Sequence, residues 1–71
     1  MISEKAKNLL HHLVDKYHVT GKHTFDNTDY ISIANHDKLL LELHNSGLII
    51  YDEESITGYV ELTTAGMAYK F

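Results

Sequence analysis

The chain has 71 residues with six lysines, no arginine, ten acidic residues and six histidines, which give a formal net charge of −4. This length allows one domain, residues 1–71. Because there is no cysteine, a disulfide framework, a thiolate zinc site and a cysteine nucleophile are excluded. The 44% hydrophobic content predicts a small folded core. No apolar run approaches the ~20 residues that span a bilayer, and the N-terminus lacks a signal peptide, so we expect a cytoplasmic protein without membrane contact.

The first predicted element is an amphipathic helix that begins after Ser3, whose hydroxyl can cap the first turn. Its apolar residues recur at helical spacing and form one continuous stripe. These residues are Ala6, Leu9, Leu10, Leu13, Val14 and Tyr17. We expect the helix to end near Val19-Thr20-Gly21, where a β-branched pair and a glycine interrupt it.

Residues 23–34 allow more than one interpretation. His23-Thr24-Phe25 is compatible with a short strand. Asp26-Asn27-Thr28 supplies capping residues for a short helix through Ile31, but Ile31-Ser32-Ile33 is also compatible with extended backbone. The pattern therefore leaves a strand, a helix or both open in this segment.

The clearest interior element is a helix over residues 35–46. Asn35 is its expected N-cap, and the charge of Asp37 favours the first turn. The buried stripe is expected to consist of Leu39, Leu40 and Leu43. Gly47 can adopt the left-handed conformation that ends a helix.

A hairpin and a last helix are predicted to follow. The strands are residues 48–51 and 59–62, and the turn between them begins with Asp52-Glu53-Glu54-Ser55. Thr63 is the expected cap of a short helix from Thr64 to about Tyr69. We expect this last segment to bring Met67 and Phe71 into the core.

The order of these elements, together with two short motifs, resembles the winged-helix family. The motifs are Leu40-x-x-Leu43-x-x-x-Gly47-Leu48-Ile49 and Leu62-Thr63-x-x-Gly66. In that family the helix that ends in Gly-Leu-Ile is the recognition helix, the hairpin is the wing, and Leu-Thr-x-x-Gly opens the element after the wing. The resemblance covers roughly residues 3–70. It implies an α+β fold with a three-helix core, a C-terminal β-hairpin wing and a short last helix.

The resemblance also implies a binding face made of the helix 35–46 and the wing 52–58. The residues expected to point outward are Lys38, Leu41, Glu42 and Asn45 on the helix and Asp52, Glu53 and Glu54 on the wing. Most winged-helix proteins bind duplex DNA with this face, where Asn45 can read adenine and Lys38 can bind phosphate or guanine. Duplex affinity depends largely on neutralising phosphates, so an acidic wing and the absence of arginine disfavour DNA.

We therefore favour a protein partner or self-association, and keep a sequence-specific DNA-binding transcriptional regulator as the alternative. An outward Leu41 would mark a contact surface, although single exposed leucines are also common on surfaces without a partner. The acidic turn has a second interpretation as a solvated loop that keeps the protein soluble. The overall expectation is a small regulator from a bacterium, phage or plasmid.

The other polar clusters predict neither catalysis nor a cofactor. His11, Asp15 and His18 share one side of the first helix, but a solvated pair is a simpler interpretation than a metal site. The serines lack a nucleophile-elbow context, and there is no glycine-rich phosphate loop. The carboxylates of Glu53 and Glu54 are expected in an exposed turn, where nothing would raise a pKa for acid catalysis.

Overall fold

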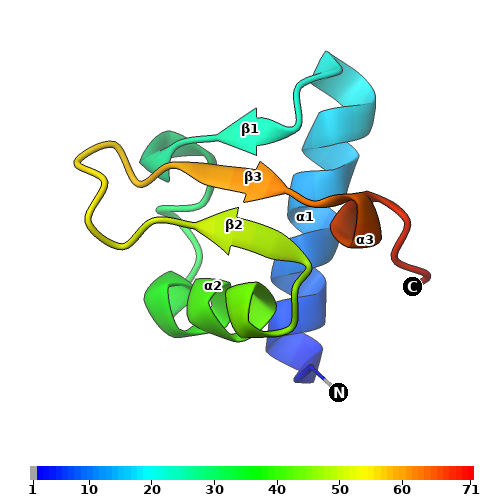
Figure 1. Ribbon diagram of the computed structural model, residues 1–71, viewed down its shortest axis with the longest axis horizontal. Coiled ribbons are helices and arrows are strands. Elements are labelled where there is room, and N and C mark those ends of the chain that lie inside the picture. The colour runs from blue at the N-terminus through cyan, green and yellow to red at the C-terminus, as the bar shows by residue number, and fades with distance from the viewer. Residues whose placement is uncertain (1) are drawn as a thin grey trace.

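The computed structural model describes residues 2–71 as three α-helices, one 3-10 helix and three strands (Figure 1). In chain order these are α1 (Glu4–Thr20), β1 (Thr24–Phe25), η1 (Asn27–Asp29), α2 (His36–Asn45), β2 (Ile49–Tyr51), β3 (Val60–Leu62) and α3 (Thr64–Met67). The strands form one antiparallel sheet in the order β1-β3-β2. Buried side chains of α1, α2 and all three strands share one core. The α+β fold expected from the sequence is confirmed, and the arrangement fits a small winged helix.

The first helix has the limits that its capping residues predict. The Ser3 hydroxyl accepts a hydrogen bond from the Ala6 N–H at 3.2 Å. Gly21 ends the helix with φ 75°, and its N–H donates to the Tyr17 carbonyl at 2.8 Å. The predicted stripe is buried, except that Tyr17 is half-buried at its end.

The segment before α2 contains both a strand and a helical turn. Asp26 and Asp29 form a capping box around η1, in which the Asp29 carboxylate accepts from the Asp26 N–H and the Asp26 carboxylate accepts from the Thr28 N–H. This reciprocal bonding closes a single 3-10 turn, so the helix ends at Asp29 instead of Ile31. The extended alternative for residues 31–33 is wrong, because these residues lie in turns.

The second α-helix begins at the predicted place with Asn35 as its N-cap, but the cap does not use the Asn35 side chain. Asn35 has φ 60° and ψ 27°, and its side chain makes no capping hydrogen bond. Residues 30–35 form turns and a bend before α2, and asparagine tolerates the left-handed backbone found there better than most residues with a side chain. The three predicted leucines of α2 are buried.

The two motifs meet each other at the end of the hairpin. Ile49 of β2 is paired with Leu62 of β3, and the Thr63 N–H donates to the Leu48 carbonyl at 3.2 Å. The Thr63 hydroxyl donates to the Gly47 carbonyl at 2.8 Å and accepts from the Gly66 N–H at 3.1 Å. The motif residues therefore act mainly as a structural clasp between the start of β2 and α3.

The C-terminal segment differs from its prediction. The helix α3 ends at Met67, which packs against the core as expected. Phe71 is 53% exposed and lies on the His11 ring, with centroids 4.5 Å apart. The expectation that Phe71 enters the core is wrong, because α3 has a single turn and the chain beyond it runs over the surface of α1.

Gly47 has the left-handed conformation expected of it, with φ 77°. A Cβ atom added here would meet nothing within 4 Å, so a substitution tests backbone strain alone. We expect Gly47→Val to lower the free energy of unfolding by more than about 1 kcal/mol. Gly47→Asn is the matched control and should cost less, because asparagine visits this region more readily. Urea denaturation measures both, and equal stability of the Gly47→Val variant and the wild-type protein would contradict the assignment.

Candidate binding face on the second helix and the wing

The helix part of the predicted binding face is smaller than the sequence indicated. Lys38 and Asn45 are exposed on α2. Leu41 is half-buried, so it does not form the projecting apolar contact that was expected. This leaves a polar helix surface with a single lysine.

Glu42 has a partner inside the fold. Its carboxylate accepts hydrogen bonds from the Ser3 N–H and, at 3.0 Å, from the Ser3 hydroxyl. This places a negative charge at the N-terminus of α1, where the helix dipole favours it. The contact ties α2 to the start of α1 and leaves Glu42 half-buried, so its part in binding stays a prediction.

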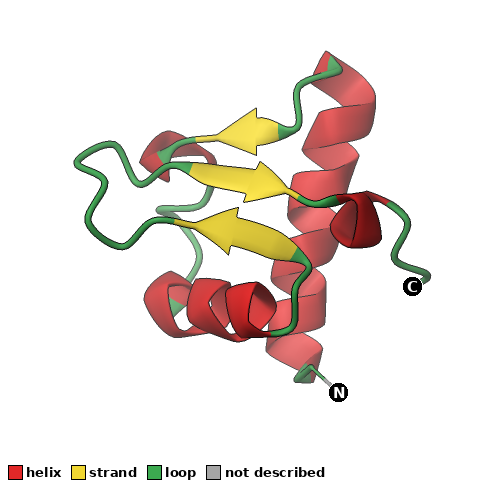
Figure 2. Cartoon of the chain, in the orientation of Figure 1, coloured by secondary structure: helices red, strands yellow, loops and turns green. Residues whose placement is uncertain are grey.

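The wing is the loop between β2 and β3, and it projects beyond the sheet (Figure 2). Asp52, Glu53 and Glu54 are exposed on it, as predicted. The Asp52 carboxylate accepts from the Glu54 N–H at 3.0 Å, and its carbonyl accepts from the Ser55 N–H at 3.1 Å. These bonds fold the acidic residues into a turn.

Ile56 is the functional candidate that the sequence analysis missed. Its side chain is 99% exposed beyond the acidic turn, which makes it the most exposed of the large apolar residues that the structure describes. The available signal was an isoleucine inside a polar loop, where neither strand periodicity nor a core position explains it.

The base of the wing is fixed to the segment before α2. The buried Tyr30 donates its phenolic hydrogen to the Gly58 carbonyl at 2.6 Å, and the Asn27 N–H donates to the Thr57 carbonyl at 2.9 Å. Burial is the main cause that raises the pKa of Tyr30, with further contributions from Tyr51 and nearby carboxylates. The phenol therefore stays protonated and remains a hydrogen-bond donor well above neutral pH.

Charge is distributed unevenly between this hairpin and the rest of the chain. Residues 49–62 contain four carboxylates and no lysine. The remaining residues contain six acidic residues and six lysines. The whole formal net charge of −4 is therefore carried by the hairpin.

The outer face of the hairpin combines these charges with apolar side chains. Ile50 and Tyr59 are both exposed there, on either side of Glu61. The Tyr59 hydroxyl donates to Glu61 Oε1 at 2.8 Å, which is the main cause that raises the pKa of Tyr59. His23 Nε2 lies 3.7 Å from the same carboxylate oxygen. The face thus presents an apolar and acidic surface.

The edge of β2 is covered by a histidine. The Nδ1 atom of His44 lies 3.2 Å from the Ile49 carbonyl oxygen and 3.4 Å from the Tyr51 nitrogen. Both backbone groups point away from β3 in this register. His44 therefore occupies the place where an added strand would pair, which protects an otherwise open edge.

The backbone N–H groups that flank β1 are already bonded. The Lys22 N–H donates to the Thr20 hydroxyl at 3.2 Å, and the Asp26 N–H donates to Asp29 Oδ2 at 3.1 Å. A partner strand longer than β1 would have to displace these bonds, which disfavours strand addition at this edge.

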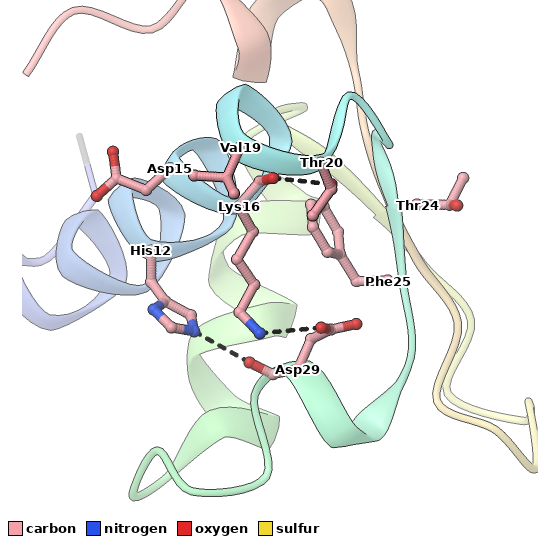
Figure 3. A pocket seen from close by; sticks show the side chains of 8 residues that line it. All are labelled: His12, Asp15, Lys16, Val19, Thr20, Thr24, Phe25 and Asp29. Carbon is pink, nitrogen blue, oxygen red and sulfur yellow. Dashed lines mark hydrogen bonds and ion pairs between the residues drawn. The ribbon is translucent and has the colours of Figure 1, made fainter.

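A hollow of about 460 Å³ lies between α1 and the β1–η1 segment (Figure 3). Two of the polar side chains that line it, Lys16 and His12, contact Asp29 of η1. Lys16 Nζ donates to Asp29 Oδ1 at 3.0 Å, and His12 Nε2 lies 3.1 Å from the Asp29 carbonyl oxygen. These contacts hold η1 against α1, and they leave the hollow without a converging set of free polar groups for a ligand.

The histidines and carboxylates of α1 do not converge on a metal position. His11 Nε2 lies 3.6 Å from Asp15 Oδ1, whereas the His18 ring lies against Tyr17 with centroids 5.5 Å apart. Within residues 2–71, no three His, Asp or Glu side chains are grouped for metal binding.

The Asp29 carboxylate makes the stability of the fold depend on pH in the acid range. Burial acts to raise its pKa, but the Asp26 N–H and the Lys16 ammonium together lower it below the ordinary value. The stabilisation by this carboxylate is therefore complete above its unfolded pKa of about 3.9 and is lost as pH falls through the lower folded pKa.

We expect Asp29→Asn to be less stable than wild type at pH 7, and the difference to shrink as the pH falls below about 4. Asp15→Asn is the control, because Asp15 is exposed on the surface of α1. Thermal unfolding from pH 7 to pH 2.5 measures this. A stability difference that stays constant over that range would contradict the assigned role.

Comparison of the chain with protein-family models, with curated proteins and with solved structures finds no match. Among residues 2–71, no helix is long and apolar enough to cross a membrane.

Proposed function

We propose that the chain is a non-catalytic winged-helix binding module that acts through a protein partner, as a small regulator of bacterial, phage or plasmid origin. The element order and the clasp between the two motifs support the winged-helix assignment. The observation that carries the choice of partner is the charge of the face formed by α2 and the wing. Residues 36–58 contain five carboxylates and one lysine. A surface of this kind repels phosphates and suits a protein.

Duplex DNA is the alternative partner, and two observations favour it. Lys38 and Asn45 are both exposed on α2, where a recognition helix would present them to base edges. Against this, the acidic wing would lie close to the phosphate backbone. In addition, η1 is a single 3-10 turn, whereas a helix-turn-helix uses a full first helix to cross the backbone.

Charge reversal of the wing tests this proposal by gain of function. Wild-type protein should bind mixed-sequence duplexes weakly, with a slope of only about −2 in log K against log salt, because few cations can reach phosphates. The triple variant Asp52→Lys, Glu53→Lys, Glu54→Lys should bind more tightly, with a slope of about −4 to −5. Fluorescence anisotropy over several salt concentrations measures both values.

The matched control adds the same charge on the exposed surface of α1, as Glu4→Lys, Asn8→Lys, Asp15→Lys and His18→Lys. The wing variant and this control gain the same charge, so they separate a general electrostatic effect from one located at the wing. Tight wild-type binding with a steep slope would overturn the proposal. Equal gains in the two variants would show that the wing is not the part of the surface that excludes DNA.

A further inference from the structure

We infer that the hairpin docks on a lysine- and arginine-rich protein surface and inserts Ile56 into an apolar depression there. This rests on the proposed function in taking the partner to be a protein. Beyond the proposed function, it names the chemistry of the partner surface and the part of the domain that binds it. The docking surface, called the hairpin face below, consists of Ile50, Asp52, Glu53, Glu54, Ile56, Tyr59 and Glu61.

The charge of the partner follows from the asymmetry of the chain. All of the net negative charge lies within residues 49–62, and the rest of the molecule is formally neutral. A potential confined to one face steers association with the opposite charge and disfavours partners of like charge. An acidic hairpin face therefore selects a basic surface.

The apolar depression follows from the exposure of Ile56. Its side chain is 99% exposed, whereas Ile50 and Tyr59 beside the strands are partly covered. Apolar residues scattered singly on a surface need no partner, but here three lie on one hairpin together with all of its carboxylates. An apolar centre with a charged surround is the usual arrangement of a protein interface.

The wing is also held in shape before binding. Tyr30 and Asn27 fix its base through Gly58 and Thr57, and the Asp52 hydrogen bonds fold the acidic turn. A loop that is already ordered loses less conformational entropy when it docks. We therefore expect Ile56 to insert without a prior rearrangement of the wing.

The hairpin face of a second copy does not fit this face. Two hairpin faces that met would oppose four carboxylates with four others, with no lysine on either hairpin. Strand pairing between copies is hindered as well, because His44 covers the β2 edge.

The experiment uses a defined probe in place of the unidentified partner. The probe is an amphipathic helical peptide of lysine and leucine, and the reference is the same peptide with glutamate for every lysine. Each is titrated into isotope-labelled protein while backbone amide resonances are followed by NMR. We expect only the lysine peptide to shift resonances, with the largest shifts in residues 50–61, and we expect salt to weaken the binding.

Variants then separate the apolar contact from charge alone. Ile56→Ala should weaken the binding of the lysine peptide about tenfold, because it removes methyl and methylene groups that the peptide would bury. Ile31→Ala is the matched control, since Ile31 is 62% exposed outside the hairpin, and it should have no effect. The triple variant Asp52→Asn, Glu53→Gln, Glu54→Gln should also weaken binding and reduce its salt dependence.

The inference is overturned if the shifts centre on α1, if Ile56→Ala and Ile31→Ala behave alike, or if the glutamate peptide binds equally well. It is also overturned if the protein alone forms a dimer through residues 50–61, as measured by mass and by NMR. The proposed function fails separately, through tight wild-type DNA binding in the anisotropy assay. The two failures are therefore distinguishable.

Discussion

Gly66→Ala is expected to lower the free energy of unfolding by about 3 kcal/mol, a large share of the stability of so small a domain. An added Cβ would lie 2.0 Å from the Leu48 carbonyl oxygen, which is backbone and cannot rotate away. The helix α3 would have to move, and the Thr63 hydrogen bonds to Gly47 and Leu48 would be strained. The cost combines overpacking with partial loss of a helix cap.

Ala65→Ser is the control for this substitution, because Ala65 is exposed in the same turn. Urea denaturation of both variants measures the effect. If Gly66→Ala lay within about 0.5 kcal/mol of wild type, as surface substitutions do, the close approach of α3 to Leu48 would be wrong.

The second large effect is expected at Tyr30. Tyr30→Ala should lower the free energy of unfolding by about 3–5 kcal/mol, because it removes a buried aromatic ring and leaves a cavity under the wing. Tyr30→Phe keeps the ring and loses the hydrogen bond to the Gly58 carbonyl, so it should cost only about 1 kcal/mol.

A double-mutant cycle with Gly58 tests the contact itself. A Cβ at Gly58 would lie 2.2 Å from the Tyr30 hydroxyl oxygen, in addition to the strain of φ 68°. Gly58→Ala should therefore be less costly in the Tyr30→Phe background than in wild type. Chemical denaturation of the four proteins gives the coupling, and strict additivity would contradict the contact between the wing base and Tyr30.

Local patterns were sufficient to predict the regular elements. The stripe of α1, its Ser3 cap and the leucines of α2 depend on periodicity and capping within one element, and all are confirmed. Gly47 was also predictable, because the end of a helix before a strand calls for a left-handed residue.

The features that sequence patterns do not reveal depend on how the elements are packed. Helical spacing places Glu42 outside, but Ser3 lies close to it only once α1 and α2 are packed. Asn35 is the N-cap that its pattern predicts, yet within the turns before α2 it has a left-handed backbone and no side-chain capping bond. Ile56 was overlooked because an isoleucine inside a polar loop indicates an exposed apolar residue only once the loop is known to project from the fold.

The two motifs that resemble the winged-helix family have a structural explanation. Gly47, Thr63 and Gly66 hold α3 against the start of β2, and none of them belongs to the candidate binding face. The motifs therefore support the fold, while function depends on the surface residues that the fold displays. Here the wing is acidic, and carboxylates at that place repel the phosphates of a duplex.

The central claim is that the face made of α2 and the wing binds protein and not DNA. Fluorescence anisotropy at physiological salt, with a pool of genomic duplex fragments and with mixed-sequence duplex, tests it most directly. A mass measurement under the same conditions detects a dimer that would double the DNA contacts. We expect weak, sequence-independent binding that Asn45→Ala leaves unchanged. Nanomolar binding to one sequence, lost on Asn45→Ala, would contradict the claim.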